Sequence, residues 1–522
     1  MKSPFARGLI FVIITSLLIG GVIFFNRILA GDAFTSEEAQ HALYGFWIWR
    51  DIQTLDLGAF GYDTQRQMVW PFLHSWFLGL VFLIFAPGYV SARLLSLFFF
   101  LAAMILIYLF SNELCDKKSW RVGVLAVLLA LTSPLMIEFA SLNMIEGLGA
   151  LLFMLAAHVY MMFEEKRITI EYVFIALIIG LSIYINYLYA YLLIPSFAVL
   201  TLVRVGPMSY QAVQLRRRGE KEALHFIWWA YRKLIVLGII AFLSAIWFSF
   251  SFNRKITLLF DSVFKYSGGT IVQGLWQNLL YYPRVIVENV SFSPWLGLFL
   301  VVALFLPRVA AHYRGLHRIY IYVWTTLVLL TLTIPTKAPH LLYIVVPFIF
   351  IIFAGVVVYI YDELRKTNKN FATALILIIL LPSLLSFPKT LGLLFPVGRG
   401  ESFVTVLDYY KTSIPKGKNI AATINLLHLN PDGIKFHFRD WQAEIMADVF
   451  LSEEEMARAA DYLVTLDLDE NSKYRFEVQD DSLFRWSAWL KDREMRGDVR
   501  LYSSRRFGQI GVTAKIYEAL HQ

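Results

Sequence analysis

Two adjacent glutamates, Glu37 and Glu38, follow the first long apolar run of the chain, in the segment GDAFTSEEAQHALYGFWIWRD at residues 31–51. If that run crosses a membrane, both carboxylates lie at the bilayer surface, where an acid beside an apolar interior usually has a functional role. Such a carboxylate can take the proton of a hydroxyl that attacks an anomeric carbon, as one carboxylate does for water in inverting glycosidases. The alternative is that both acids only favour the positive end of a helix capped by Thr35 or Ser36.

A third acid, Glu146, begins a predicted apolar helix in the segment SLNMIEGLGALLFMLAA at residues 141–157. An acid at the mouth of a membrane span is costly unless it faces a cavity or a partner. Glu146 therefore becomes a second candidate for the same site if the spans place it on the side of Glu37 and Glu38. The plainer interpretation is an acid at a helix N-terminus, capped from Asn143.

Two further places carry cationic side chains that could neutralise a phosphate. The segment TKAPH contains Lys337 and His340, with Tyr343 shortly after them, and the amides of the following helix start add positive potential. Arg93 lies at the start of another apolar run, where its guanidinium can hold two phosphate oxygens at once. The alternatives are a lysine that only anchors the membrane boundary and an arginine that only sets orientation.

The composition indicates what kind of protein must position these groups. Of the 522 residues, 58% are apolar and 16% are charged, and the mean hydropathy is +0.59. These values are typical of a polytopic integral membrane protein. The net charge of +8 does not predict nucleic-acid binding, because the basic residues cluster between apolar runs. Cys115 is the only cysteine, which excludes an intramolecular disulfide and a cysteine-based metal site.

Apolar runs that are long enough, or nearly so, to cross a bilayer predict about eleven spans, since a spanning helix needs about 20 mostly apolar residues. The N-terminal run is too long for the apolar part of a signal peptide, so we interpret it as an uncleaved first span. The predicted spans are 9–30, 91–111, 121–137, 146–163, 170–186, 188–204, 234–252, 294–306, 319–335, 341–361 and 371–388.

The apolar run at 71–86 is short for a span and is bounded by Pro71 and Pro87. If it crossed, several basic loops would lie on the opposite side from the N-terminal Lys2 and Arg7, against the positive-inside rule. If it does not cross, all the basic loops lie together. We therefore predict a non-spanning interfacial helix at 71–86, a cytoplasmic N-terminus, and a first outer loop that carries Glu37 and Glu38.

After about residue 390 the chain becomes more charged, which predicts a small extracytoplasmic α/β domain at 391–522. A serine followed by acids predicts a helix over 452–460. Strand-like runs predict strands at 419–425, 435–439, 462–468 and 511–517.

Four blocks of sequence, in this order, resemble GT-C type glycosyltransferases that depend on a polyprenyl-phosphate sugar. The blocks are SEEAQHALYG, VWPFLHSWFLGLVFLIFAPGYVSARLLSLFF, LTSPLMIEFASLNMIEGLGALLFMLAAHVYM and TKAPHLLYIVVPFIFIIFAG. This group includes the dolichyl-phosphate-mannose protein mannosyltransferases and the lipid A aminoarabinose transferase. The resemblance implies an all-α transmembrane catalytic domain at 1–390, with about 11 spans and interfacial helices in the first outer loop.

The resemblance also implies roles for single residues. Proteins of this group carry an Asp-Glu pair in the first outer loop, whose first member is the proposed base. Glu37 and Glu38 stand at these positions, so a Glu replaces the usual Asp; the implied base is Glu37, and Glu38 is the alternative. Glu146 stands where the group has a second-loop acid, often Asp.

The late loop of the group contains a lysine, and Lys337 with His340 and Tyr343 matches it. Arg93 matches the arginine of an RLLS-like block. These residues are the implied ligands of the donor phosphate.

His41, Tyr62 and Arg66 are weaker candidates for contacts with the sugar or the acceptor, and each is equally consistent with an ordinary polar residue of the outer loop. One histidine near acids does not predict a metal site. No metal or cofactor is therefore assigned, and a divalent cation between the acids and the phosphate is left open.

These observations predict an inverting glycosyltransferase of the plasma membrane that moves a sugar from a polyprenyl monophosphate to an extracytoplasmic lipid, glycan or protein. Its expected partners are this donor, this acceptor and membrane lipids. The alternatives are a ligase that transfers an oligosaccharide from a diphosphate carrier and a transporter. Paired repeats and charged residues within the spans, which would favour a transporter, are not evident.

Overall fold

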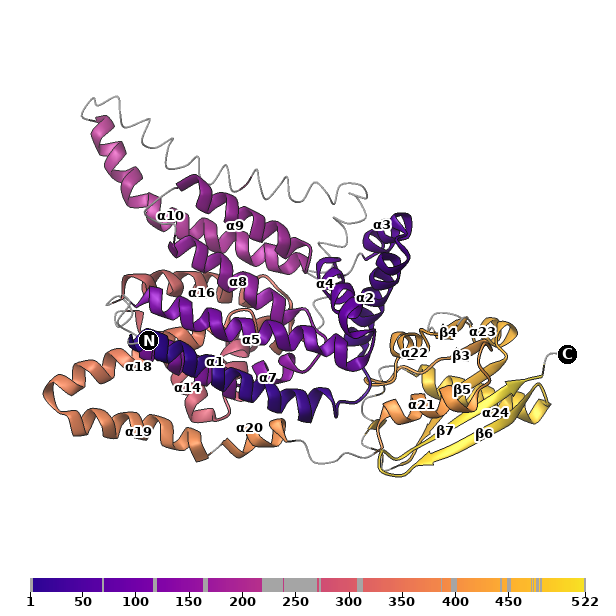
Figure 1. The fold of residues 1–522 in the computed structure, drawn as a ribbon. Helices are drawn as coiled ribbons and strands as arrows, with labels where there is room; N and C mark the ends of the chain where they lie inside the picture. Colours follow the sequence, from indigo (N-terminus) through magenta and orange to yellow (C-terminus); the bar gives the residue numbers. More distant parts are fainter. Residues whose placement is uncertain are drawn as a thin grey trace. The chain divides into compact units, whose positions relative to one another are not determined.

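The protein is described by a computed structural model, which is mostly helical and ends in a small sheet domain (Figure 1). The residues described are 3–67, 70–115, 120–162, 168–217, 238, 270–271, 274–307, 313–385, 387–395, 401–441, 444–447, 452–470, 472, 474–475, 478 and 481–520. The predicted span at 234–252 lies almost wholly outside them.

The chain forms two compact units, and each contains segments that are far apart in the sequence. Unit 1 comprises Met1–Arg27, Gly61–His74 and Leu94–Pro396. Unit 2 comprises Ile28–Phe60, Ser75–Arg93 and Val397–Gln522. The segment with Glu37 and Glu38 is therefore part of the same unit as the C-terminal domain.

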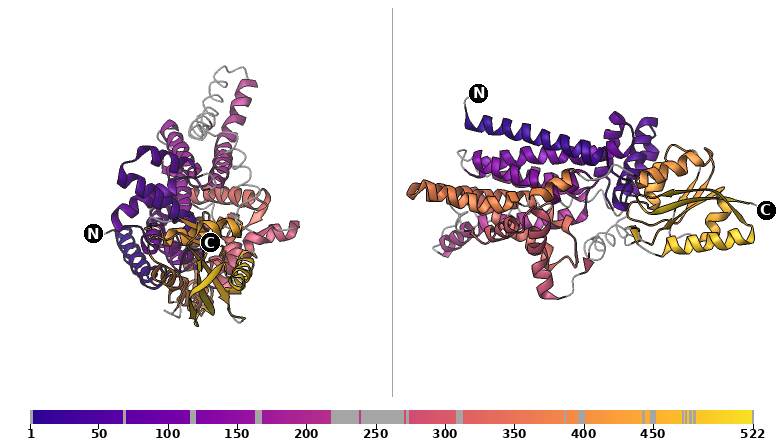
Figure 2. Two further views of the ribbon diagram at one scale, coloured as in Figure 1. Left: turned by 90° about the vertical axis from the view of Figure 1, so that its right-hand side faces the viewer. Right: turned by 90° about the horizontal axis from the view of Figure 1, so that it is seen from below.

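Unit 1 is a bundle of helices in which α1 packs on α6, α10 on α16, and α18 on both α6 and α19. Figures 1 and 2 show α1 and α5 running alongside each other, and the Tyr108 hydroxyl of α5 donates a hydrogen bond to the Phe5 carbonyl of α1 at 2.7 Å. The described elements are α1 (Pro4–Ile23), the π-turn η1 (Phe24–Ile28), α5 (Tyr89–Leu114, which begins in unit 2), α6 (Trp120–Thr132), α7 (Pro134–Ala140), α8 (Glu146–Met162), α9 (Ile168–Ile183), α10 (Tyr187–Arg217), β1 (Thr270–Ile271), α13 (Leu275–Val285), η3 (Ile286–Val290), α14 (Pro294–Ala303), α16 (Arg314–Leu332), β2 (Thr336–Lys337), α17 (Pro339–Leu342), α18 (Val346–Thr367), α19 (Lys369–Leu385) and α20 (Phe387–Leu394).

Four helices in the described part of the chain are long and apolar enough to cross a membrane: Pro4–Ile28, Tyr89–Leu114, Gly315–Leu332 and Val346–Thr367. A fifth span is possible if α6 and α7 cross together, although they are bent by 68° at Ser133 and Pro134. A proline cannot donate the helical hydrogen bond and disfavours helix at the preceding residue, which explains the break. Several spans are thus confirmed, and the total of eleven stays a prediction.

The segment predicted to be the first outer loop is helical and belongs largely to unit 2. It contains α2 (Ser36–Thr54), α3 (Leu57–Gln65) and α4 (Leu73–Phe85). The 13 residues of α4 extend only about 20 Å, whereas the hydrocarbon core is about 30 Å thick. Helix α4 lies close against α2, because a Cβ atom at Gly45 of α2 would come within 2.6 Å of the Leu78 side chain of α4.

The C-terminal domain has a five-stranded sheet in the order β4-β3-β5-β7-β6, as the predicted α/β class requires. Strands β4, β3 and β5 are parallel to one another, and β7 is antiparallel to both β5 and β6. Helices α21 and α22 pack on one face of the sheet, and α23 and α24 pack on the other. The elements are α21 (Phe403–Ser413), β3 (Ile420–Ala422), α22 (Pro431–His437), β4 (Ile445–Ala447), α23 (Glu453–Ala459), β5 (Tyr462–Leu468), α24 (Ser482–Arg496), β6 (Val499–Phe507) and β7 (Val512–Ala519).

The predicted helix at 452–460 and the strand at 462–468 are confirmed, whereas the strand predicted at 435–439 is wrong. The latter residues lie in and just after α22. The Asn430 side chain accepts a hydrogen bond from the Gly433 amide and Pro431 occupies the first helical position, so a strong helix start overrides the alternating pattern KFHFR.

The length of α4 generates a prediction about topology. In a Cys115→Ala background, Gln53→Cys before α4 and Gly88→Cys after it should both react with a membrane-impermeant maleimide added from outside. The native Cys115 is buried, and a Cβ atom at Gly88 meets only an ordinary contact with Ser91, so the variants should fold. Labelling of the two positions from opposite sides would show that α4 spans the membrane.

Candidate functional site

Helix α2 places Glu37 and Glu38 in its first turn. Thr35 is the N-cap, and the Glu38 carboxylate accepts hydrogen bonds from the Thr35 amide at 3.1 Å and the Thr35 hydroxyl at 3.4 Å. This arrangement is a capping box, in which a glutamate at the third helical position satisfies the amide of the N-cap. Capping from Thr35, which the sequence offered as the plainer interpretation, therefore applies to Glu38.

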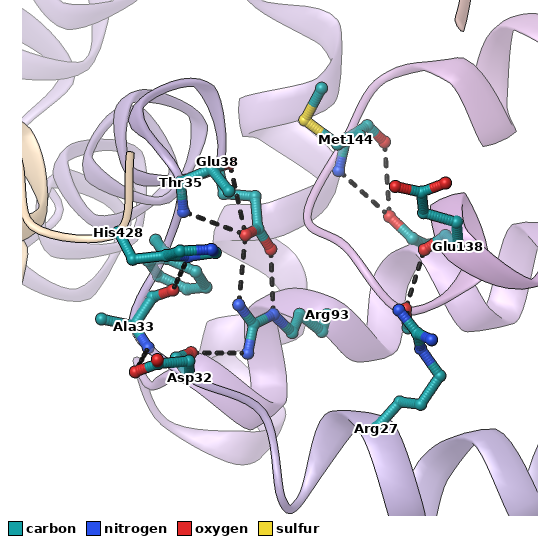
Figure 3. A network of polar contacts seen from close by, with 12 residues as sticks. Arg27, Asp32, Ala33, Thr35, Glu38, Arg93, Glu138, Met144 and His428 are labelled. Atoms are coloured by element: carbon teal, nitrogen blue, oxygen red, sulfur yellow. Dashed lines mark hydrogen bonds and ion pairs between the residues drawn. The ribbon is translucent and has the colours of Figure 1, made fainter. Parts of the chain in front are cut away.

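Glu38 also forms a buried ion pair with Arg93, the fifth residue of α5 (Figure 3). The Nε atom of Arg93 donates to one carboxylate oxygen at 2.9 Å and a terminal nitrogen donates to the other at 3.1 Å. The two side chains are 4% and 0% exposed, and the remaining terminal nitrogen of Arg93 donates to the Asp32 carbonyl at 2.9 Å. The two-point contact that the sequence assigned to a phosphate is made here with Glu38.

Glu37, one residue earlier, lies in a different environment. It is half-buried, and it has no ion-pair partner within the part of the chain that the structure describes. Burial raises the pKa of Glu37 above its usual value. A carboxylate that is short of solvation and has no paired cation is a better proton acceptor than one held by an arginine. The two neighbouring glutamates are therefore chemically distinct.

In unit 1, Lys337 lies in β2, which pairs with β1, and its side chain is turned toward the end of α16. The residue is 1% exposed. Its ammonium group donates to the carbonyls of Leu330 at 2.5 Å and Thr331 at 2.8 Å, and also to that of Ile334. Lys337 thus binds carbonyls at a helix C-terminus, which have no partners within the helix. Burial lowers its pKa to about 8.

His340, Tyr343 and Glu146 are neighbours in the same unit. The Phe139 ring lies 6.3 Å from the His340 ring and 5.4 Å from the Tyr343 ring, measured between centroids. Burial, and then the charge of Glu146, raise the pKa of Tyr343, while burial lowers the pKa of His340 to about 4. Glu146 is the first residue of α8 and is buried. This group therefore brings together one acid, one neutral imidazole and one phenol.

The weaker candidates have local roles. Arg66 lies over the ring of Tyr62 at 5.5 Å and pairs with Asp63 at 2.9 Å, all within or just after α3. His41 is buried in α2. Among the described residues, no group of three or more His, Cys, Asp or Glu side chains could hold a metal ion, and the divalent cation stays an open prediction.

The predicted site residues thus fall into two sets. Glu37, Glu38, His41 and Arg93 belong to unit 2, and the second set belongs to unit 1: Glu146, Lys337, His340, Tyr343, Tyr62 and Arg66. The meeting of both sets in one pocket stays a prediction.

Sequence reasoning missed two contacts made by arginines. In unit 2, the backbone carbonyl of Asp32 accepts a hydrogen bond from Arg93. The only sequence signal for this contact is that an aspartate stands two residues after the first predicted span. In unit 1, Arg27 of η1 donates to the Ser141 hydroxyl and the Leu393 carbonyl, both at 2.9 Å, and its charge acts on Glu138 (Figure 3). An arginine at the end of the first span is the corresponding signal.

Several apolar helices that are long enough to cross a membrane, together with a small C-terminal sheet domain, define a multi-pass membrane protein. Residues 70–210 match the family of dolichyl-phosphate-mannose-protein mannosyltransferases. A comparison with curated proteins finds no match.

The fold is similar to that of ArnT from Cupriavidus metallidurans. The apo structure of that protein gives a TM-score of 0.61 at 12% identity, and the structure bound to undecaprenyl phosphate gives 0.59 at 11%; each comparison covers 98% of both chains. The oligosaccharyltransferase of Archaeoglobus fulgidus, in a complex with Zn and sulfate, gives 0.52 at 13% identity and covers 87% of this chain and 67% of that one. The predicted resemblance to GT-C proteins is therefore confirmed for the fold.

The buried ion pair generates a prediction about stability. Arg93→Ala removes the buried cation beside Glu38, and breaking a buried pair costs about 3–5 kcal/mol. Thermal unfolding of the purified protein in detergent should therefore occur at a clearly lower temperature. The matched control is Arg284→Ala, because Arg284 forms an exposed pair with Glu288 at 2.7 Å and such pairs contribute about 1 kcal/mol or less. Equal shifts in the two variants would contradict the buried pair.

Proposed function

We propose that this protein is an inverting glycosyltransferase that takes a sugar from a polyprenyl monophosphate and passes it to a hydroxyl group of an extracytoplasmic acceptor. The observation that carries the proposal is the difference in environment between the Glu37 and Glu38 carboxylates. The Glu38 carboxylate is bound by Arg93 in an ion pair and accepts a hydrogen bond from the Thr35 amide. Glu37, at the start of α2, is instead a partly desolvated carboxylate with a raised pKa. The GT-C fold and the match to a mannosyltransferase family support a membrane glycosyltransferase.

In the proposed reaction, a new bond forms between the acceptor oxygen and the anomeric carbon of the sugar. The bond from that carbon to the phosphate oxygen breaks, and the electron pair leaves with the polyprenyl phosphate. Glu37 takes the proton of the acceptor hydroxyl. The leaving phosphate needs no general acid, because it is already a stable anion, but it gains negative charge that fixed positive groups can stabilise.

Lys337 is the proposed cation for this charge. It is charged at neutral pH and lies just before α17, whose first amides add positive potential. One of its three hydrogen bonds to carbonyls would then be exchanged for a phosphate oxygen. His340 and Tyr343 offer further hydrogen bonds to the donor, and Glu146 supports the base or the acceptor. A phosphate role for Arg93 is not retained, because its two-point contact goes to Glu38.

The orientation follows from the same proposal. The N-terminus is cytoplasmic, and unit 2 with the C-terminal domain lies on the extracytoplasmic side of the plasma membrane. His41, Tyr62 and Arg66 are the further residues proposed to contact the sugar or the acceptor.

A second candidate is an oligosaccharide ligase that uses a diphosphate carrier, because the fold also resembles that of an oligosaccharyltransferase. Both reactions need a base and a site for a leaving phosphate. Turnover with a monophosphate-linked sugar would support the first candidate, and turnover only with diphosphate-linked glycans would support the second.

The role of Glu37 predicts a specific kinetic defect. Glu37→Gln removes the proton acceptor, so transfer from a monophosphate-linked sugar should fall by about 10²- to 10⁴-fold with the protein still folded. The matched control is Glu453→Gln, which makes the same change in the first turn of α23. In the unaltered protein, kcat/KM should fall as the pH is lowered through the raised pKa of Glu37, because protonation removes the base. Full activity in both Glu37→Gln and Glu38→Gln would remove the assignment.

The role of Lys337 predicts a change in donor affinity. Lys337→Met should raise the KM for the lipid-linked donor about tenfold or more, since a hydrogen bond to a charged group contributes about 1.5–3 kcal/mol. The KM should also rise in the unaltered protein above about pH 8, where the ammonium loses its proton, but not in Lys337→Arg. If Lys337→Met lowers the unfolding temperature and leaves the KM unchanged, Lys337 only caps α16.

A further inference from the structure

The three residues that precede the N-cap of α2 are bound by side chains and backbone of the C-terminal domain. These residues are Asp32, Ala33 and Phe34, and we refer to them as the anchor segment. They lie in the same compact unit as residues 397–522, although about 370 residues separate them in the chain. The C-terminal domain therefore contacts the backbone that leads directly into the proposed base.

Asn430 makes the central contact. Its side-chain amide nitrogen donates to the Phe34 carbonyl at 3.2 Å and to the Leu427 carbonyl at 3.4 Å. Its side-chain oxygen accepts from the Gly433 amide at 2.8 Å and thereby caps α22. The residue is 1% exposed. One buried side chain thus joins a helix of the C-terminal domain to the anchor segment.

The other two residues of the anchor segment are held as well. His428 donates from Nδ1 to the Ala33 carbonyl at 3.3 Å, in the tautomer that carries its proton there. The Asp32 carboxylate accepts from the Ala33 amide at 2.7 Å and from the Val404 amide, in the first turn of α21, at 3.3 Å. Ala33 is also part of the apolar core that surrounds α21. Figure 3 shows His428 and Arg93 beside the anchor segment.

The Phe34 side chain adds an apolar contact. It is fully buried, and its ring lies 4.5 Å from that of Tyr89 and 5.2 Å from that of Phe436 in α22, measured between centroids. Each residue from 32 to 34 therefore has a fixed backbone or side-chain partner. Thr35 follows at once as the N-cap, so the direction of the first turn of α2 is set by these contacts.

We propose that Asn430 is a positioning residue for Glu37, and that the C-terminal domain is a structural part of the catalytic site. This inference rests on the proposed role of Glu37 as the base. A base must be held within a fraction of an ångström of the hydroxyl that it deprotonates, and a displacement of about 1 Å can cost about 10²-fold in rate. Loss of the Asn430 contact lets the first turn of α2 move, while the donor and the acceptor still bind.

The decisive variant is Asn430→Asp. An aspartate keeps an oxygen for the Gly433 amide and is an equally good N-cap, so α22 should still form. It replaces the amide nitrogen by an oxygen that faces the Phe34 carbonyl, which removes the hydrogen bond and adds repulsion. The matched control is Asn368→Asp, because Asn368 caps α19 by accepting from the Phe371 amide at 3.0 Å and is exposed.

In Asn430→Asp we expect kcat for transfer from a monophosphate-linked sugar to fall by about 10- to 100-fold, with the KM for donor and acceptor nearly unchanged. The acid limb of the pH profile should also shift, because Glu37 becomes more solvated. The control Asn368→Asp should behave like the unaltered protein. An unchanged kcat in Asn430→Asp, in a preparation where Glu37→Gln is inactive, would overturn the inference and leave the proposed function intact.

A second measurement does not depend on activity. Hydrogen exchange followed by mass spectrometry should show faster exchange of the amides in residues 33–41 in Asn430→Asp than in the unaltered protein, and no change in Asn368→Asp. If no donor is turned over by the unaltered protein, the proposed function fails, and the exchange data still test the contact. Unchanged exchange in Asn430→Asp would overturn the positioning role in either case.

Discussion

The ion pair between Arg93 and Glu38 is the interaction on which the arrangement of unit 2 depends. Moving two charges out of water costs several kcal/mol for each ion, and only close geometry with further hydrogen bonds offsets this cost. Here both carboxylate oxygens of Glu38 are bound by Arg93, and the same carboxylate also accepts from Thr35. The pair therefore fixes the start of α5 against the start of α2.

One consequence is that two identical neighbouring side chains acquire different chemistry. Glu38 is bound by an arginine and by its own helix start, whereas burial raises the pKa of Glu37. Enzymes often separate the roles of two carboxyl groups in this way, through their surroundings and not through their type. Under the proposed function, the glutamate at position 37 acts as the base in place of the aspartate that the resemblance leads one to expect.

A second consequence concerns the path of the chain between α2 and α5. Arg93 and Glu38 are 55 residues apart in the chain. The chain therefore passes through α3 and α4 and then comes back to the start of α2, where Arg93 meets Glu38. Gly45 allows α4 to lie close against α2. The C-terminal domain completes the unit by binding the anchor segment, which joins the fold of that domain to the geometry of the proposed base.

The sequence predicted most of what depends on neighbours in the chain, with one exception at α22, and it failed where distant residues decide. The capping of α2 and α23 and the strand Tyr462–Leu468 are local patterns, and all were predicted. The helix at Pro431–His437 was mistaken for a strand because the alternation of KFHFR outweighed its cap. The partner of Arg93 is 55 residues away and depends on a tertiary contact, which one sequence does not reveal. The carbonyls bound by Lys337 lie only three to seven residues earlier, but no sequence pattern marks a lysine that turns back onto the end of its preceding helix.

The central claim is that Arg93 stays on Glu38 during the reaction and that Glu37 faces the reacting sugar. The most direct test is an electron cryomicroscopy structure of the protein in a lipid nanodisc with polyprenyl phosphate bound. The account predicts that both hydrogen bonds between Arg93 and Glu38 are retained and that the Glu37 carboxylate points toward the phosphate. A structure in which Arg93 leaves Glu38 to bind the phosphate, with Glu37 turned away, would contradict it.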